Sequence, residues 1–359
     1  MMDSLKISAE NFREQYFKKF SDIPLYESSV IKVSKDFEKM EQSSFKESFK
    51  PPVEYSKIEE VASISYSPEN IFKFEKEFIE PKSGFGFFVF SRFEKILFLE
   101  CKNSEKCGFI KIKSGKGLSL EPLFIDVPKN TNSSLFVHFD LSDGEAAFNL
   151  IRARIADKGK LSLYFLFENF KGRRFVDFSS KLGKGSSMEV YPVFLEGESS
   201  FFRSNHTIIE EKSTYREKLI ALLKNRGKGD FKTVVAEENA EAKVKVEARG
   251  VLKDSSRAFI GGVLKVKKEA VKSNSLYSAH CLKLSQNSRA DIEPDLEIEA
   301  LDVTASHSAS VSPVDDEKLF YLESRGLNEE KAKKEVSSGF LFALIEKNDF
   351  VKEKIEGIL

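Results

Sequence analysis

Residues 244–298 read VKVEARGVLKDSSRAFIGGVLKVKKEAVKSNSLYSAHCLKLSQNSRADIEPDLEI, and one short pattern recurs along them. An apolar–charged–apolar triplet begins at Val244, Leu264, Leu282 and Leu296, so successive starts lie about 20, about 18 and about 14 positions apart. Each triplet places two apolar side chains on one face and a charge on the other, as a half-buried strand requires. Recurrence at roughly 20 residues is typical of a solenoid in which each coil adds a strand to a stacked sheet. A β-sandwich would give similar strands, but at shorter spacings of roughly 8 to 12 residues.

Outward from this stretch, short alternating segments separated by Gly, Ser, Asn and Lys extend over residues 51–312. They predict strands and turns, and therefore an all-β core. One segment, Thr214 to Lys224, predicts a helical insertion instead, because its apolar residues fall on one helical stripe. That stripe consists of Tyr215, Leu219, Leu222 and Leu223. Helical patterning does not alternate with each strand, so a doubly wound α/β sheet is not expected.

Both ends of the chain predict helices. Residues 1–50 form the expected N-terminal helical region, and residues 313–359 the C-terminal one. In the latter, Asp315 can cap a helix that ends at Ser324, and Asn328 can cap a second, with a short third segment after it. Because a solenoid end exposes unpaired strand edges, we expect the terminal helices to cap those edges as well.

Composition narrows the class of protein. Lys plus Arg and Asp plus Glu both total 57 in the 359 residues, so the formal net charge is zero. Nucleic-acid and membrane-surface roles need a basic face, so neither partner is expected. The first residues lack a signal-peptide pattern, and no stretch approaches about 18 uninterrupted apolar residues. An odd, sparse set of cysteines suits a reducing compartment, so we expect a cytoplasmic protein. They are Cys101, Cys107 and Cys281.

Three Gly-Lys-Gly segments, at residues 115–117, 183–185 and 227–229, invite comparison with a phosphate-binding loop. A P-loop needs Ser or Thr directly after the lysine and a helix behind it, whereas each segment has Gly in that position. The three segments therefore predict turns, and we expect no nucleotide site in this chain.

Closely spaced carboxylates raise an enzymatic alternative. Glu297 and Glu299 stand two residues apart, and Asp295 precedes them in the same alternation, so all three lie on one face of a strand. Glycosidases use paired carboxylates, and polysaccharide lyases built on a β-helix cluster them in this way. Nothing else in the sequence marks a carbohydrate groove, and a solvated strand face explains the same spacing.

His307 and Cys281 are the candidate metal ligands. His307 stands in a run of small residues, and Cys281 precedes it along the chain, directly after His280. A solenoid can bring positions at such a separation onto neighbouring coils, and imidazole and thiolate both suit iron. Two ligands alone make no stable site, however, because structural metals need about four. The alternative is a buried cysteine acting as a small hydrophobe and a hydrogen-bonded histidine.

The C-terminal residues carry a resemblance to a known family. An Ser-Arg-x-x-x-x-Gly segment ends at Gly262, Pro-x-Leu-Glu-Ile spans Pro294 to Ile298, Asp302-Val303 precedes Ser306-His307, and Leu-Phe-Tyr-Leu-x-Ser-Arg-Gly ends at Gly326. With these motifs, the run from about Ser255 to Phe340 resembles the SufB/SufD family of iron–sulfur cluster assembly proteins. The resemblance implies a right-handed parallel β-helix with helical termini.

The resemblance also implies a function and partners. Family members form a non-catalytic scaffold, usually a SufB–SufD pair bound to the ATPase SufC, on which a transient iron–sulfur cluster is assembled at the subunit interface. The ATPase would dock on the C-terminal helical region. The residues expected to make that contact are Leu319, Phe320, Tyr321, Arg325 and Phe340.

His307 matches the histidine that the two family branches share. Ser308 stands where SufB has a glutamate, and Ala279 where SufB has its assembly cysteine, with Cys281 two residues further on. The chain therefore resembles SufD more closely, and Cys281 is only a substitute ligand in this comparison. A homodimeric SufB-type scaffold stays open as an alternative.

Overall fold

The computed structural model describes residues 53–66, 96–114, 117–141, 145–169, 172–195, 198–208, 210–345 and 348–359. The helices predicted within residues 1–50 lie outside this part of the chain.

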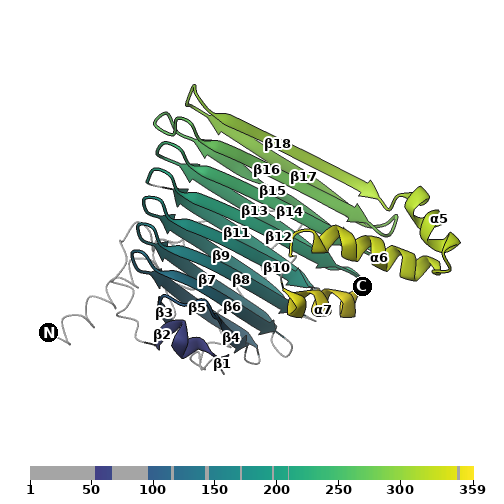
Figure 1. Cartoon of the computed structure of the whole chain (residues 1–359). Coiled ribbons are helices and arrows are strands. Elements are labelled where there is room, and N and C mark those ends of the chain that lie inside the picture. The colour runs from purple at the N-terminus through teal and green to yellow at the C-terminus, as the bar shows by residue number, and fades with distance from the viewer. Residues whose placement is uncertain are drawn as a thin grey trace.

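The strands form two nine-stranded sheets that face each other, and from β3 onward successive strands alternate between them (Figure 1). The first sheet consists, in spatial order, of β1 (Val53–Ser56), β4 (Cys107–Lys113), β6 (Asn132–Leu141), β8 (Lys160–Asn169), β10 (Ser187–Leu195), β12 (Thr214–Leu223), β14 (Lys243–Leu252), β16 (Asn274–Lys283) and β18 (Thr304–Pro313). The second consists of β2 (Ala62–Ser65), β3 (Leu97–Cys101), β5 (Leu118–Val127), β7 (Ala146–Ile155), β9 (Arg173–Leu182), β11 (Ser199–Ile208), β13 (Lys228–Glu237), β15 (Arg257–Val266) and β17 (Arg289–Ile298).

Neighbouring strands are parallel except for β1 and β2, which pair antiparallel with β4 and β3. The chain is therefore a parallel β-solenoid whose coils each add one strand to each sheet. This confirms the predicted all-β core.

The length of a coil differs from the spacing of the triplets. Lys243 pairs in register with Asn274, 31 positions on, and Asn274 with Thr304, 30 positions on. The four triplets lie on β14, β15, at the end of β16, and on β17, so they alternate between the two sheets. The shorter intervals between triplets are thus steps from one sheet to the other, and the predicted repeat of one coil per triplet is wrong.

A continuous apolar core fills the space between the sheets, and stacked phenylalanines make up much of it. Phe167 of β8 and Phe194 of β10 stack with their ring centroids 4.6 Å apart, and Phe194 also contacts Phe231 of the opposite sheet at 4.9 Å. In-register parallel strands place register partners of neighbouring coils directly above one another, so large side chains stack from coil to coil.

The helix predicted over Thr214 to Lys224 is wrong, because this segment is strand β12. Tyr215, Glu217 and Leu219 alternate into the interior, while Ile220 and Leu222 on the opposite face are buried under the C-terminal helices. Because β12 is buried on both faces, its apolar residues do not alternate with polar ones, and their spacing resembles the apolar stripe of a helix. Glu217 added to the error, because a glutamate is expected on an exposed face and this one is buried.

The three C-terminal helices are α5 (Asp316–Ser324), α6 (Glu329–Phe342) and α7 (Asp349–Ile358). As predicted, Asp315 and Asn328 cap the first two, their side chains accepting hydrogen bonds from the backbone N–H groups of Glu317 and Lys331. Among the described helices, none has the length and apolar character needed to cross a membrane.

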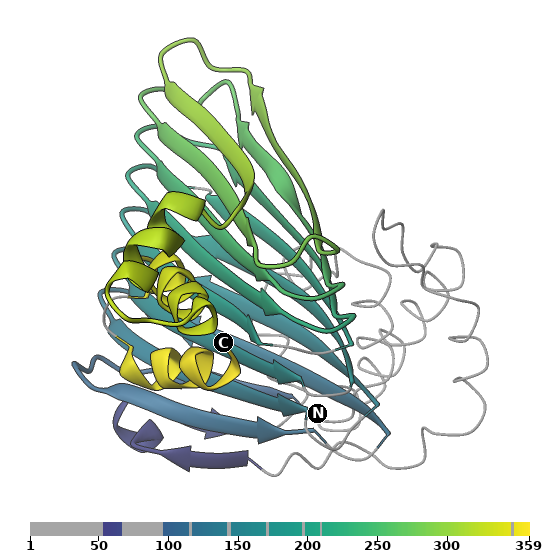
Figure 2. The ribbon, with the colours of Figure 1, turned by 90° about the vertical axis from the view of Figure 1, so that its right-hand side faces the viewer.

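These helices lie beside the outer face of the first sheet instead of covering its end (Figures 1 and 2). Leu344, Ile345 and Val351 pack in one apolar cluster with strand residues such as Ile220 and Leu222. The expectation that helices cap the strand edges at this end is therefore wrong. The outward apolar residues of the middle coils explain the position, because the helices remove them from water.

An ion pair also fastens α7 to the sheet. Lys354 of α7 donates to Glu168 of β8 at 2.9 Å, and Nε2 of His138 lies 2.8 Å from the same carboxylate. Burial alone would raise the pKa of Glu168, but the hydrogen bonds from His138 and Lys354 hold that pKa below its ordinary value. The carboxylate is thus kept charged where the helix meets the strand.

Gly262 of β15 is a position where only glycine fits, and Gly262→Ala should destabilise the fold strongly. Its φ is +151°, and an added Cβ would stand 1.8 Å from the backbone oxygen of Thr233. Because backbone must move to relieve this contact, we expect a loss of about 3 kcal/mol or more in the free energy of unfolding. Gly339→Ala in α6 is the control: nothing lies within 4 Å of its added Cβ, and the change should stabilise by up to about 1 kcal/mol. Equal denaturation midpoints for the two variants would contradict this reading.

Candidate functional site

The two ends of the solenoid differ. At the N-terminal end, β1 and β2 close the sheets in antiparallel fashion, and Ile58 and Val61 between them are buried in the core. At the other end, β17 and β18 have a strand neighbour on one side only, and no described helix or strand pairs with their outer edges (Figure 1). Such edges present backbone N–H and C=O groups that can pair with another chain.

His307 lies on β18, the last strand of the first sheet, among the side chains that point toward the space between the two sheets; these side chains of β17 and β18 form the last inner layer. His307 pairs in register with Tyr277, which is buried in the core between the sheets. Residues paired in register share a face of the sheet, so His307 lies on the inner side, above Tyr277. The other inner positions of β17 and β18 are apolar, and Ile298 and Val311 among them are 45% and 42% exposed. Among the described residues of these two strands, His307 is therefore the one imidazole in an otherwise apolar inner layer, and no described element covers that layer.

A stack of register partners leads from His307 down into the solenoid: Tyr277, then Val246, then Glu217. The Tyr277 hydroxyl donates to the backbone oxygen of Gly261 at 2.7 Å, and burial raises its pKa well above the ordinary value. Glu217 accepts hydrogen bonds from Tyr215 at 2.6 Å and Thr233 at 2.5 Å. The stack thus ends, three coils below, in a buried polar cluster.

Sequence reasoning missed this cluster around Glu217. Ser204 of β11 donates to Glu217 at 3.1 Å, and His206 is fully enclosed between Ser180 and Tyr215. Burial lowers the pKa of His206, although the nearby Glu217 works against that shift. The two-residue spacing of Tyr215 and Glu217 could have indicated the cluster, because a strand places both side chains on one face. The prediction of a helix for this segment placed them on different faces instead.

Cys281 lies apart from His307. It is 2% exposed, and it pairs in register with Val311, four residues beyond His307 on β18. Four strand residues span about 13 Å, too far for both side chains to bind one ion. Cys101 and Cys107 are on β3 and β4 near the other end. Across the described residues, no three His, Cys, Asp or Glu side chains are grouped to hold a metal ion.

The buried Cys281 thiol should resist alkylation in the folded protein. Burial raises its pKa to about 12, so the thiol stays protonated at pH 8 and lacks the thiolate that reacts with alkylating agents. With iodoacetamide under native conditions, we expect the exposed Cys107 to be labelled first and Cys281 only after denaturation. Mass spectrometry of tryptic peptides measures both rates. Labelling of native Cys281 at the rate of the denatured chain would contradict the buried position.

The predicted docking residues divide into two groups. Phe320 and Tyr321 of α5 are 72% and 58% exposed, and the Arg325 guanidinium lies 5.3 Å from the Tyr321 ring centroid. Leu319 and Phe340 instead pack on the apolar cluster under the helices, where the Arg249 guanidinium stacks on the Phe340 ring at 5.1 Å.

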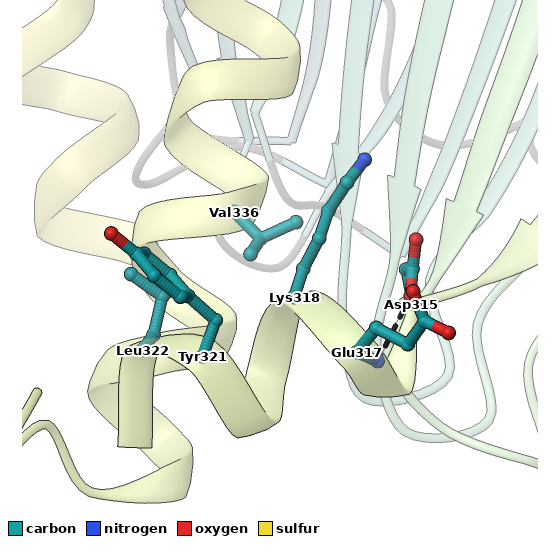
Figure 3. A pocket seen from close by; sticks show the side chains of 6 residues that line it. All are labelled: Asp315, Glu317, Lys318, Tyr321, Leu322 and Val336. Atoms are coloured by element: carbon teal, nitrogen blue, oxygen red, sulfur yellow. Dashed lines mark hydrogen bonds between the residues drawn. The ribbon is translucent and has the colours of Figure 1, made fainter. Parts of the chain in front are cut away.

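A pocket of about 420 Å³ lies between α5 and α6 (Figure 3). It is lined by Asp315, Glu317, Lys318, Tyr321, Leu322 and Val336. The exposed aromatic pair therefore stands beside a concave surface on the helices.

The carboxylates of Glu297, on β17, and of Glu299, directly after this strand, each pair with a lysine. Glu297 binds Lys265 at 2.8 Å, and Glu299 binds Lys267 at 2.7 Å. The hydrogen bond from Lys267 lowers the pKa of Glu299, the opposite of what a general acid requires. Asp295 is exposed on the same strand. This arrangement fits a solvated strand face.

Two of the three Gly-Lys-Gly segments can be assessed. Residues 183–185 form the turn between β9 and β10, with Gly185 at a φ of +61°, and residue 227 closes the turn between β12 and β13 through a backbone hydrogen bond to Lys224. The turn predicted at residues 183–185 is confirmed. The turn predicted over residues 227–229 is wrong in its position, because residues 228 and 229 already belong to β13 and the turn ends at residue 227. In the remaining segment, residues 115 and 116 lie outside the described part of the chain.

Comparison with known proteins agrees with this architecture. The family model described as SUF system FeS cluster assembly, SufBD core domain, matches residues 110–340. The chain is 29% identical over 209 residues to the iron–sulfur cluster assembly protein SufD of Bacillus subtilis, covering 56% of this chain and 47% of that protein. It is 26% identical over 227 residues to SufD of Escherichia coli, covering 62% and 53%.

A SufBD family protein of Pyrococcus horikoshii is 29% identical over 171 residues, 48% of this chain and 35% of that protein. The chain thus spans about half the length of the curated relatives it matches. Since the family model covers well over half of the chain, and two of these relatives are SufD proteins, the chain belongs to the SufB/SufD family of iron–sulfur cluster assembly proteins and is closer to SufD.

Proposed function

We propose that this chain is a SufD-like scaffold subunit of a SUF-type complex, paired with a SufB-like subunit and bound to a SufC-like ATPase. The observation that carries the proposal is the open end of the solenoid. There His307 lies in an apolar layer between two strand edges, and no described strand or helix pairs with these edges or covers the layer. A partner that adds strands to both edges would cover this layer and place its own groups beside His307.

In this proposal His307 is a transient ligand for iron or for the growing cluster, which is cargo and not a resident cofactor. An imidazole can bind iron through one ring nitrogen. Cluster chemistry also needs thiolates, and Cys281 is buried, protonated and distant from His307. The thiolates must therefore come from the partner subunit, so the chain itself is a non-catalytic scaffold.

The exposed pair Phe320 and Tyr321 is the proposed anchor for the ATPase. Large exposed aromatics beside a pocket are typical of residues that dominate protein–protein affinity. ATP hydrolysis would belong to that partner. A cytoplasmic location is part of the proposal, because exposed thiolates and iron require a reducing compartment.

Two other functions would use some of the same features. A homodimeric scaffold would use the same open end, with a second copy in place of the SufB-like subunit. A β-helix carbohydrate-active enzyme is not supported, because Glu297 and Glu299 are each bound to a lysine.

Purification of the untagged native complex from its own cells tests the proposal. We expect the subunit list to contain a second SufBD-type chain and an ABC-type ATPase. A complex with the ATPase and two copies of this chain alone would establish the homodimeric scaffold instead. A chain that purifies without either partner under conditions that preserve weak complexes would refute the proposal.

A further inference from the structure

The turns on the two sides of the solenoid differ in charge. On the side where the chain passes from the second sheet to the first, cations and carboxylates of neighbouring turns pair with each other. Lys129 lies 3.5 Å from Asp157 of the next coil, and Lys212 lies 3.8 Å from Glu241 of the coil after its own. Charges of opposite sign thus stack along this side, which stabilises neighbouring coils.

The opposite side, where the chain passes from the first sheet to the second, is basic over two successive coils. Residues 224–228 read KNRGK, and residues 253–257 read KDSSR. Lys228, the lysine of the third Gly-Lys-Gly segment, and Arg257 are register partners at the first positions of β13 and β15. Since neighbouring strands lie about 4.8 Å apart, the cations of the two coils are close together. The surface that we call the basic edge consists of Arg226, Lys228, Lys253 and Arg257.

The described carboxylates around the basic edge have other partners. Asp254, in the second of the two turns, accepts a backbone hydrogen bond at 2.9 Å. Glu198 of the coil below contacts Arg173 at 3.3 Å, and Asp291 of the coil above contacts Arg289 at 3.3 Å. Within the part of the chain that the structure describes, no ion pair neutralises the four cations of the basic edge.

Stability does not explain this arrangement. Like charges on register partners are destabilising, and Lys228 beside Arg257 is such a pair. The paired turns on the other side show that the same fold can place a carboxylate beside a cation at equivalent positions. Arg226 and Arg257 are exposed, so an anionic partner can reach them and remove the repulsion.

A protein segment suits the basic edge better than a nucleic acid does. Nucleic-acid sites combine a broadly basic surface with aromatic side chains on which bases stack. This chain has zero formal net charge, and residues 224–228 and 253–257 include no aromatic. An α-helix lying along the stack of coils presents side chains three and four positions apart at rises of about 4.5 and 6 Å. Those rises bracket the separation of the coils, so carboxylates at such positions can meet cations of successive coils.

We infer that the basic edge binds an acidic helix of another protein, with carboxylates three and four positions apart on one face. The inference does not rest on the proposed function, because it uses neither the open end nor α5. Exposed ion pairs of this kind speed association and weaken as salt increases. The basic edge therefore serves transient encounters with an acidic protein.

Titration of labelled peptides onto the full-length chain tests the inference. The probe is a helix-forming peptide with glutamates three and four positions apart on one face. The control peptide has the same composition, with the glutamates spread around the helix. Binding is measured by fluorescence anisotropy at about 0.15 M salt, where exposed charges are partly screened. We expect the control peptide to bind at least about threefold more weakly, because fewer of its carboxylates can face the basic edge at once.

Charge reversal locates the binding surface. Arg226→Glu with Arg257→Glu should raise the dissociation constant of the probe at least about tenfold, since two attractive contacts become repulsive. Lys158→Glu with Lys272→Glu changes the net charge equally at exposed turns on the opposite side, and should change the constant less than about twofold. Thermal midpoints show whether each variant is folded, and the milder Arg226→Gln with Arg257→Gln should still weaken binding at least about threefold.

Four outcomes would overturn the inference. The probe fails to bind the wild-type chain, or both charge-reversal variants lose binding equally, which leaves only an effect of net charge. Equal binding of the two peptides would remove the helical spacing. A single-stranded oligonucleotide that binds the wild-type chain more tightly than the probe, and is released by the Arg226→Glu, Arg257→Glu variant, would assign the basic edge to nucleic acid instead.

Discussion

His307→Ala should abolish iron–sulfur cluster maturation while leaving the protein folded and its complex assembled. The side chain lies in the exposed last layer of the solenoid, so its removal takes no packing from the core. We expect the free energy of unfolding to change by no more than about 0.5 kcal/mol, as for other surface substitutions. The activity of an iron–sulfur reporter enzyme, measured in cells whose only SufD-like subunit is the variant, should fall to the level of a deletion strain.

His280→Ala is a matched control for this prediction. His280 lies one coil below on the outer face of the same sheet, where its ring nitrogens contact Ser278 at 3.0 Å and Ser310 at 2.7 Å. Its loss should leave cluster maturation near the wild-type level. Normal maturation in the His307→Ala strain would remove the role assigned to His307, and equal defects in both strains would point to a general effect on the open end.

Replacing Phe320 and Tyr321 together by Ala should release the ATPase. Both rings project from α5 into solvent, and exposed aromatics that become buried in an interface commonly contribute about 2 kcal/mol or more. We therefore expect at least about a 30-fold rise in the dissociation constant for the ATPase, measured by titration of the purified partner. The fold should be unaffected, because neither side chain packs in the cluster under the helices.

Tyr55→Ala supplies the comparison. This tyrosine is 52% exposed on β1, at the opposite end of the first sheet. Its removal deletes an exposed ring of similar size without touching α5, and ATPase affinity should be unchanged. A double variant of α5 that binds as tightly as Tyr55→Ala would show that the ATPase docks elsewhere.

Much of this architecture could be predicted from the sequence, and the errors have definite physical causes. The triplets identified strands because Leu264 and Val266 face the core while Lys265 faces water. The triplets gave the wrong coil length, because their spacing along the chain does not show which of the two sheets each strand joins. The strand register shows it: the triplet at Leu264 pairs with the triplet at Leu296, one full coil later.

The candidate site was only partly predictable. The small residues around His307 and the family motifs singled it out, and the register then placed it above Tyr277 at an open end. The separation of His307 from Cys281 could not be predicted, because it depends on the register of β16 and β18. In that register, Cys281 pairs with Val311, four residues beyond His307. The cluster at Glu217 was hidden for a related reason, since a buried carboxylate looks like a solvated one until its partners are known.

Photo-crosslinking shows which end of the solenoid contacts the second SufBD-type subunit. A photo-reactive amino acid is placed in cells at position 308, on the free edge strand β18, or at position 54, an exposed residue on the edge strand β1 at the opposite end of the same sheet. We expect a covalent product with a second SufBD-type subunit from position 308 and none from position 54. A product from position 54 but not from position 308 would contradict the assignment of the open end, with His307 in its last layer, as half of a shared assembly site.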